Sequence, residues 1–174
     1  MRLFPLLVGL LPAMPLPAIA ANRWEAGATA AVVVLGPAER QTGGVMPGLS
    51  VRHVWSAGDH AELGLGAQVG AFGFGDETRW IGVLGGLHGS AAWRPIRGLS
   101  LSGEFDADVG RIPICNPWGL CLRFIGLFPS FNGGVTWHHG DRFALRATAG
   151  VRVVEALAWS GIAGQGGVSG VVSW

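Results

Sequence analysis

The chain has 174 residues and a formal net charge of +1, with 12 arginines, no lysine and 11 acidic residues. Only 13% of its residues are charged, against about 25% in soluble globular domains. A neutral chain without a basic cluster excludes a nucleic-acid-binding surface. The absence of lysine, which soluble proteins use freely on exposed strand edges, also counts against a solvated exterior.

The first 20 residues are typical of a secretory signal peptide. Arg2 is the only charge, an apolar run extends from Leu3 to Pro17, and Ala18-Ile19-Ala20 fits a small-x-small cleavage site. Four prolines within the run disfavour a retained transmembrane helix. No later segment has the ~18 consecutive apolar residues of a membrane-spanning helix. We therefore expect a cleaved signal at 1–20 and one mature domain at 21–174.

The mature chain alternates apolar and polar residues with a period of two, which predicts β-strands. One stretch shows the pattern most clearly, with Leu101 and Phe105 on one face and Glu104 and Asp106 on the other. Most of the expected strands reach the ~9–11 residues that a tilted strand needs to cross a bilayer. The eight expected strands are 22–35, 45–56, 60–73, 79–94, 98–110, 122–138, 142–155 and 162–174.

Tryptophan recurs at one end of these strands. If consecutive strands are antiparallel, five tryptophans lie at the same end of one sheet and share the parity of the apolar residues around them. Because an indole is amphipathic, a ring of tryptophan on an apolar face is typical of a membrane–water interface. The predicted interface girdle consists of Trp24, Trp55, Trp93, Trp137 and Trp174.

The same alternation would also fit a soluble, lipocalin-like barrel with its apolar face inward. Three features favour the opposite facing. The polar face is rich in glycine and serine and lacks lysine, and a soluble barrel has no reason to place tryptophan at one level. The apolar face also contains so many alanines and glycines that it would leave cavities in a core. We therefore expect lipid outside and the polar face in the lumen.

The lengths of the connections predict the orientation in the membrane. Outer-membrane barrels have short periplasmic turns and longer extracellular loops. The tryptophan girdle lies at the end with short connections, so it is predicted at the periplasmic interface, with both termini on that side. The short connections are 56–59, 94–98 and 139–142, and the mostly longer ones are 36–44, 74–78, 111–121 and 155–161.

With these features, the mature chain resembles the small eight-stranded outer-membrane β-barrels of Gram-negative bacteria, the OmpA/OmpX-like class. The resemblance rests on the architecture and on the ending Gly170-Val171-Val172-Ser173-Trp174. Family members usually end in phenylalanine, with tryptophan an accepted variant. The resemblance implies export through the periplasm, residence in outer-membrane lipid and recognition by the barrel-assembly machinery. No subfamily motif is present, so it carries over no catalytic residue.

Eight strands enclose a lumen just wide enough for side chains to fill it. The predicted fold class is therefore all-β, an antiparallel up-and-down transmembrane barrel with a narrow, polar, filled lumen. Its charged residues should pair, because an unpaired buried charge costs several kcal/mol. A narrow conduit for water or small solutes is the alternative. The predicted lumen network comprises Glu25, Arg52, Glu62, Glu104, Asp106, Asp108, Arg146 and Arg152.

One group of lumen residues has the composition of a catalytic site. A three-residue turn at 95–97 would place His88 opposite Glu104, with Ser90 nearby, as base, orienter and nucleophile. The His-x-Ser pattern also resembles that of outer-membrane lipid A deacylases. The asparagine-rich context of that motif is absent, however, and the residues face the lumen, away from lipid. A structural lumen histidine is therefore the favoured interpretation.

Cys115 and Cys121 are the only cysteines. In an oxidising compartment they are expected to form a disulfide that pins a small loop. No neighbouring residues complete a metal site, so we predict neither metal nor cofactor. The leading hypothesis is a non-enzymatic outer-membrane barrel with a structural or surface-interaction role through its extracellular loops. The alternatives are an enzyme that modifies outer-membrane lipid and a small-solute conduit.

Overall fold

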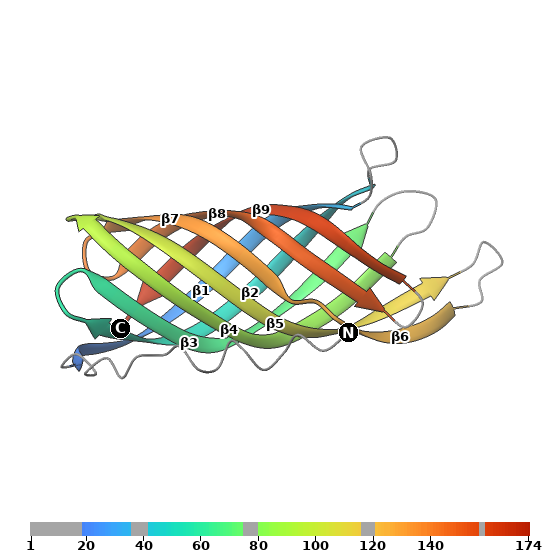
Figure 1. Ribbon diagram of the computed structural model, residues 1–174, viewed down its shortest axis with the longest axis horizontal. Coiled ribbons are helices and arrows are strands. Elements are labelled where there is room, and N and C mark those ends of the chain that lie inside the picture. The colour runs from blue at the N-terminus through green and yellow to red at the C-terminus, as the bar shows by residue number, and fades with distance from the viewer. Residues whose placement is uncertain (1–18, 36–41, 75–79, 116–120, 157–158) are drawn as a thin grey trace, which may run out of the picture.

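The computed structural model describes residues 19–35, 42–74, 80–115, 121–156 and 159–174. Its strands form one antiparallel sheet that closes on itself, and Figure 1 shows them tilted around a common axis. The predicted signal peptide lies almost entirely outside the described residues, although β1 includes its last two positions. The strands are β1 (Ile19–Leu35), β2 (Thr42–Ala57), β3 (Ala61–Phe74), β4 (Trp80–Ile96), β5 (Leu99–Cys115), β6 (Cys121–Leu127), β7 (Ser130–His139), β8 (Phe143–Ala156) and β9 (Trp159–Ser173).

The strands β6 and β7 are two parts of one long strand. Both pair with β5 on one side and with β8 on the other, and Phe128 and Pro129 separate them. Backbone hydrogen bonding continues through this break, because the N–H of Phe128 donates to the carbonyl of Asp108 and the N–H of Val153 to that of Pro129, both at 2.8 Å. Counted this way, the predicted ring of eight antiparallel strands in up-and-down order is confirmed.

The ring closes between β1 and β9. Their antiparallel register extends from Glu25 opposite Ser173 to Leu35 opposite Ala163. At the rim, the backbones of Trp24 and Trp174 exchange two N–H···O hydrogen bonds of 3.0 Å. The closure therefore joins the beginning of the described chain to its end.

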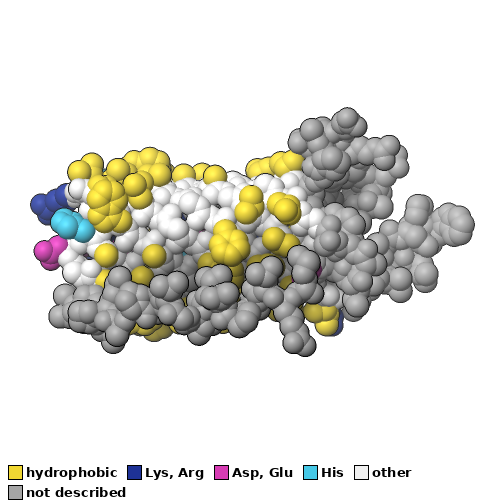
Figure 2. Space-filling view, in the orientation of Figure 1, with side chains coloured by type: hydrophobic (Ala, Val, Ile, Leu, Met, Phe, Trp, Pro, Cys, Tyr) yellow, Lys and Arg dark blue, Asp and Glu magenta, His cyan; other side chains and the backbone are white. Residues whose placement is uncertain are grey.

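The barrel is inverted relative to a soluble protein. Among the described residues, twelve polar or charged side chains are buried, against eight apolar ones. Large apolar side chains instead cover the outside, and Figure 2 shows them spread over the barrel wall. Phe105 is exposed while Asp106 is buried, because successive side chains of a strand point to opposite faces. The polar face of the alternation therefore lines the lumen.

An apolar cluster occupies the lumen near the strand ends opposite the short turns. Phe72 and Phe128 are its aromatic members, with ring centroids 5.8 Å apart. The lumen is thus apolar at this end, a feature that the sequence analysis, which predicts a polar lumen, does not anticipate. Each contributing strand supplies only one side chain, so no single strand carries the pattern. The other buried members are Val33, Leu84, Val154 and Ala163, and Met46 packs against them.

Three short turns join strands at the other end of the barrel. Each contains a glycine with positive φ, at Gly58 (80°), Gly98 (88°) and Gly140 (70°), a conformation that costs glycine nothing. The β4–β5 turn is tighter than predicted, since Ile96 pairs with Leu99 and a register shift precedes this pair. The predicted three-residue turn at this connection is therefore wrong.

The β5–β6 hairpin projects beyond the neighbouring strands, as Figure 1 shows. Within the described sheet, residues 112–115 and 121–124 pair with each other alone, and β6 pairs with β8 only through Gly126 and Leu127. The outermost pair of the hairpin is Cys115 opposite Cys121. The side chains of both cysteines lie outside the described residues, so the disulfide stays a prediction.

Gly110 and Gly103 are matched positions on β5 that test the packing of the lumen. A Cβ atom at Gly110 would lie 2.7 Å from Cε2 of Phe128, whereas a Cβ atom at Gly103 would meet nothing within 4 Å. We expect Gly110→Ala to lower the free energy of unfolding by about 1–3 kcal/mol through overpacking, and Gly103→Ala to change it little. Urea unfolding in lipid vesicles measures both, and equal stability of the two variants would contradict the position of Phe128.

Candidate functional site

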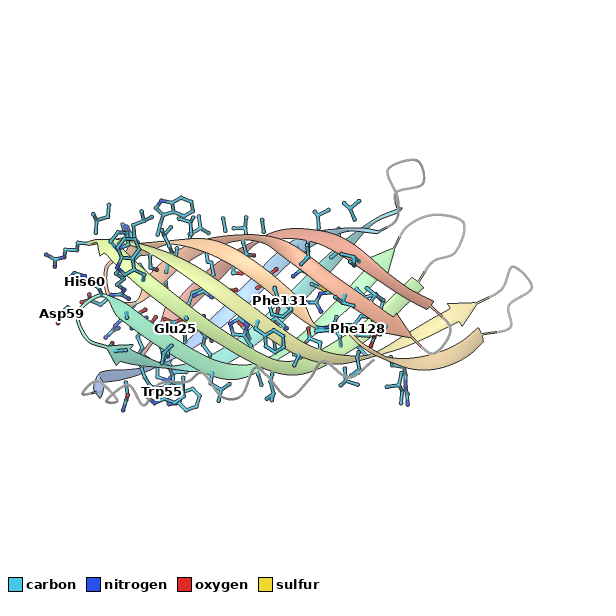
Figure 3. All side chains as sticks on the ribbon, viewed as in Figure 1. Glu25, Trp55, Asp59, His60, Phe128 and Phe131 are labelled. Carbon is cyan, nitrogen blue, oxygen red and sulfur yellow. The ribbon has the colours of Figure 1, made fainter. Side chains whose placement is uncertain are left out.

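Glu25 is the centre of an ion-pair cluster near the short turns. Its carboxylate lies 2.5 Å from Arg52 Nη2, 2.8 Å from Arg23 Nη2 and 3.6 Å from Arg146 Nη2. Figure 3 labels Glu25 inside the ring of strands, and its side chain is 4% exposed. Because salt and water screen buried pairs much less than exposed ones, these charges interact strongly.

Two further carboxylates extend this cluster. Glu62 lies 2.7 Å from Arg23 Nη1 and 2.9 Å from Arg94 Nη2, and Glu104 lies 3.3 Å from Arg146 Nε. Arg23 and Arg94 are absent from the predicted lumen network, although each lies an even number of residues from a lumen position on its own strand. We call this group the turn-end cluster: Arg23, Glu25, Arg52, Glu62, Arg94, Glu104 and Arg146.

A second group, the mid-barrel cluster, surrounds two aspartates. Arg152 Nη1 lies 2.7 Å from Asp108, and Arg152 Nη2 lies 3.7 Å from Oδ2 of Asp106. The other oxygen of Asp106 lies 2.7 Å from Nδ1 of His88. The hydroxyl of Ser130 donates to Asp106 Oδ2 at 2.5 Å. Charged and neutral partners therefore hold both oxygens of Asp106.

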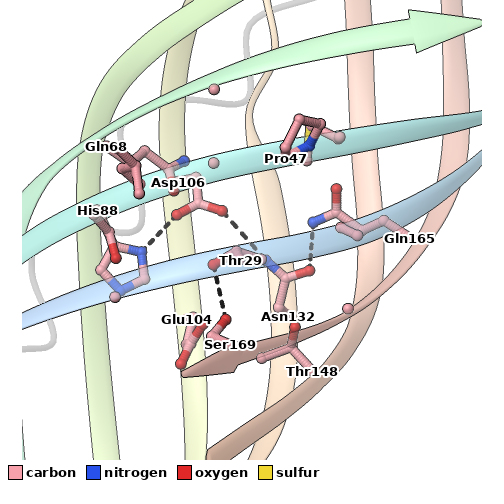
Figure 4. A pocket seen from close by; sticks show the side chains of 18 of the residues that line it. Thr29, Pro47, Gln68, His88, Glu104, Asp106, Asn132, Thr148, Gln165 and Ser169 are labelled. Carbon is pink, nitrogen blue, oxygen red and sulfur yellow. Dashed lines mark hydrogen bonds and ion pairs between the residues drawn. The ribbon is translucent and has the colours of Figure 1, made fainter. Parts of the chain in front are cut away.

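A cavity of about 80 Å³ borders the mid-barrel cluster and the apolar cluster. Figure 4 shows its polar walls, where Gln165 donates to Asn132 and the hydroxyls of Thr29 and Ser169 lie 2.8 Å apart. Gln68 donates to both oxygens of Asp108 at 2.9 Å. The space has room for a few waters, which need polar partners of this kind. It is much smaller than the ~300–1,000 Å³ pockets that hold typical small-molecule ligands.

Together the two clusters balance five carboxylates with five arginines. The predicted network has five carboxylates but three arginines, and Arg23 and Arg94 supply the difference. Each of the five carboxylates has an arginine nitrogen within 4 Å. Removing one partner of a buried pair costs about 3–5 kcal/mol, because the other charge is left uncompensated. A change at one charged lumen residue is therefore expected to destabilise the residues that pair with it.

The structure does not assemble the hypothetical catalytic group of His88, Ser90 and Glu104. The β4–β5 register places His88 opposite Asp106 and Ser90 opposite Glu104, two residues from the predicted pairing. A shift by two keeps every side chain on its predicted face but changes its partner. Among the described side chains, no hydrogen bond joins His88 to Ser90, and the Ser90 hydroxyl instead accepts a 2.9 Å hydrogen bond from Arg52.

The predicted tryptophans lie at the rim with the short turns. Trp24, Trp93, Trp137 and Trp174 are between 47% and 65% exposed, while Trp55 is half-buried. The ring of His53 lies between those of Trp24 and Trp55, with centroid distances of 4.8 Å and 4.6 Å. The rim thus presents indoles outward and charged side chains inward.

Neither a metal centre nor a spanning helix is found in the described ranges. No group of three or more histidine, cysteine, aspartate or glutamate side chains is arranged there to hold a metal ion. The same ranges contain no helix that is long and apolar enough to cross a membrane.

Comparison with solved structures identifies small barrels of similar fold. Neisserial surface protein A (NspA) matches with a TM-score of 0.65 and 13% identity over 86% of this chain and 95% of its own. Ail, the attachment invasion locus protein of Yersinia pestis, matches in complex with sucrose octasulfate, with a TM-score of 0.64 and 10% identity over 89% and 100%. The N-terminal β-barrel domain of Pseudomonas aeruginosa OprF matches with a TM-score of 0.53 and 16% identity over 87% and 97%.

No protein-family model and no curated protein sequence matches the chain. The likeness therefore concerns the fold, which is that of the small eight-stranded outer-membrane β-barrels.

Glu25 and Glu155 are matched glutamates that test the ion-pair network. Glu25 is buried against three arginines, whereas Glu155 is exposed on β8. We expect Glu25→Gln to lower the free energy of unfolding by about 3–5 kcal/mol, since it leaves buried arginines undercompensated, and Glu155→Gln to change it by less than about 0.5 kcal/mol.

The measurement is equilibrium unfolding of both variants in lipid vesicles. Combining Glu25→Gln with Arg52→Gln should cost less than the sum of the two single changes, because the two residues share one interaction. Additive costs would show that the pair does not couple.

Proposed function

We propose that this chain is an integral outer-membrane β-barrel of a Gram-negative bacterium, without enzymatic activity, that serves a structural or surface-interaction role. The observation that carries the proposal is the inverted facing. Apolar side chains cover the outside and most of the buried side chains are polar or charged, and tryptophans are exposed at one rim. Soluble monomers rarely expose apolar patches larger than a few hundred Å², whereas lipid covers such a surface.

The same reasoning assigns the orientation and the route of assembly. We infer that the rim with the short turns faces the periplasm, since outer-membrane barrels have short turns there. The chain then requires export by its N-terminal signal and insertion by the barrel-assembly machinery, which would read the C-terminal aromatic pattern on β9. Outer-membrane lipid is its permanent partner.

The surface role is assigned to the projecting β5–β6 hairpin. It lies at the end opposite the short turns and extends beyond the other strands, so in this orientation it stands outside the cell. Its projecting residues 112–115 and 121–124 are mostly apolar in sequence, with Arg123 as their one charged residue. A Cys115–Cys121 disulfide would hold the outermost pair together. NspA is a surface protein and Ail an attachment invasion locus protein by name, which agrees with a role in contact.

The arrangement of the lumen supports the absence of catalysis and of free conduction. His88 and Ser90 are engaged with Asp106 and Arg52, and the cavity beside them has room only for waters. The apolar cluster around Phe72 and Phe128 lies between that cavity and the extracellular end. Recording of the current across a planar bilayer distinguishes the proposed barrel from a small-solute conduit. We expect little or no current.

The facing of Phe105 tests the membrane assignment. Phe105 is 42% exposed and packs against Phe131 at a centroid distance of 4.9 Å, near mid-barrel on the outer wall. With Cys115 and Cys121 replaced by serine, Phe105→Cys in isolated membranes should react with a lipid-soluble reagent and resist an aqueous maleimide. The control is Asp59→Cys in an exposed turn, which should react with the maleimide. Efficient aqueous labelling of folded protein at position 105 would reverse inside and outside.

The position of the hairpin tests the orientation. An epitope inserted between Cys115 and Cys121 should bind antibody on intact cells, because the hairpin stands outside. The matched control carries the epitope after Gly58, in the β2–β3 turn, and should bind antibody only after the outer membrane is opened. Each protein is first shown to migrate as a folded, heat-modifiable barrel. The opposite pattern would place the hairpin in the periplasm.

A further inference from the structure

A pocket of about 380 Å³ lies at the rim with the short turns, lined by residues of the β4–β5 and β7–β8 turns and by Arg23 and Arg94 of the turn-end cluster. Its described lining includes the arginines Arg23, Arg94 and Arg97, and within that lining one carboxylate side chain, that of Asp141. Figure 2 shows charged side chains gathered at this end of the barrel, beyond the apolar wall. The pocket is thus predominantly cationic.

The turn-end cluster shares Arg23 and Arg94 with the pocket. Its three carboxylates offset part of the pocket's positive charge, but one positive charge remains, because the cluster contains four arginines. The mid-barrel cluster has the opposite imbalance, with Asp106 and Asp108 facing Arg152. The charges therefore cancel over the whole lumen while the excess of positive charge lies at the mouth.

Two of the lining arginines are less fully paired than the third. Arg23 is occupied, since it makes four hydrogen bonds to Glu25 and Glu62. Arg94 shares Glu62 with Arg23, and its Nε atom is buried without a hydrogen-bond partner. Arg97 is exposed and forms no ion pair with the described residues. An anion in the pocket would give Arg97 an ion-pair partner and would contact the part of the Arg94 side chain that is 35% exposed.

We propose that this pocket binds a phosphate group. A guanidinium presents a planar fork of donors that matches phosphate oxygens, and charge-assisted bonds of this kind are roughly twice as strong as neutral ones. The phosphate belongs either to a phospholipid headgroup or to a soluble phosphate compound. Phe143, which is 59% exposed, lines the same pocket, so a lipid could hold its chains along the outer wall and its phosphate at Arg97. The lipid source rests on the proposed membrane location.

The test uses the folded barrel in detergent, with Arg97→Gln as the main variant and Arg111→Gln as its control. Both arginines are exposed and each change removes one charge, but Arg111 lies on β5 near the opposite end. Native mass spectrometry measures the retention of phosphatidylglycerol, and of diacylglycerol with the same chains, which lacks the phosphate. Calorimetry with glycerol phosphate measures the soluble source.

We expect Arg97→Gln to lower phosphatidylglycerol retention about tenfold, the effect of one charge-assisted contact, and Arg111→Gln to leave it unchanged. Arg94→Gln should have a similar effect where it still folds. Binding of phosphatidylglycerol but not of glycerol phosphate assigns the lipid source, and binding of glycerol phosphate alone assigns the soluble one. Equal retention of phosphatidylglycerol and diacylglycerol, with no heat from glycerol phosphate, would overturn the site.

The folding control separates this inference from the proposed function. A protein that fails to enter membranes and shows no heat-modifiable migration contradicts the barrel itself. If the barrel folds but Arg97→Gln retains as much phosphatidylglycerol as the unchanged protein, only the proposed phosphate site is contradicted.

Discussion

Ion pairing inside a ring of eight strands is the interaction on which the rest of the structure depends. Such a ring leaves an interior only wide enough for side chains, so every charge that alternation sends inward must meet its partner there. Glu25 does so with arginines from its own strand, from β2 and from β8. These pairs link strands that are neighbours in the ring and strands that are not. The network thereby favours one position of each strand along the barrel axis relative to the others, and it balances the charge of the lumen.

The fold was predictable from the sequence because strand alternation is a local property. The facing of Phe105 and Asp106 follows from their being adjacent on one strand, whatever the rest of the chain does. The register was not predictable in the same way. Pro95 lies where the β4–β5 pairing shifts before Ile96, and no rule of turn length anticipates such an irregularity. The turn itself also lies nearer to Leu99 than predicted, and the pairing of β4 with β5 therefore differs from the predicted one by two residues, which gives His88 another partner.

The parts of the site that sequence analysis missed depend on contacts between distant strands. Arg23 and Arg94 have the parity of lumen residues, but their roles follow from the single carboxylate of Glu62, which both of them contact. The apolar cluster is even harder to predict from the sequence, because its six buried members come from six different strands or strand junctions. The similar solved structures share the eight-stranded fold with this chain at only 10–16% sequence identity. Many different sequences can alternate apolar and polar residues in the way that this fold requires.

The pairing of β1 with β9 also determines when this molecule can become a barrel. Its first contacts in the closed ring join Glu25 to Ser173 and Ala26 to Val172, so they span nearly the whole chain. Contacts of such high sequence separation form slowly, because the entropy of closing the intervening loop is lost before any stabilisation is gained. The amino-terminal strand therefore has an unpaired edge until the final strand has been synthesised and delivered. During that interval its unpaired N–H and C=O groups can pair with a strand of another chain, which is a route to aggregation.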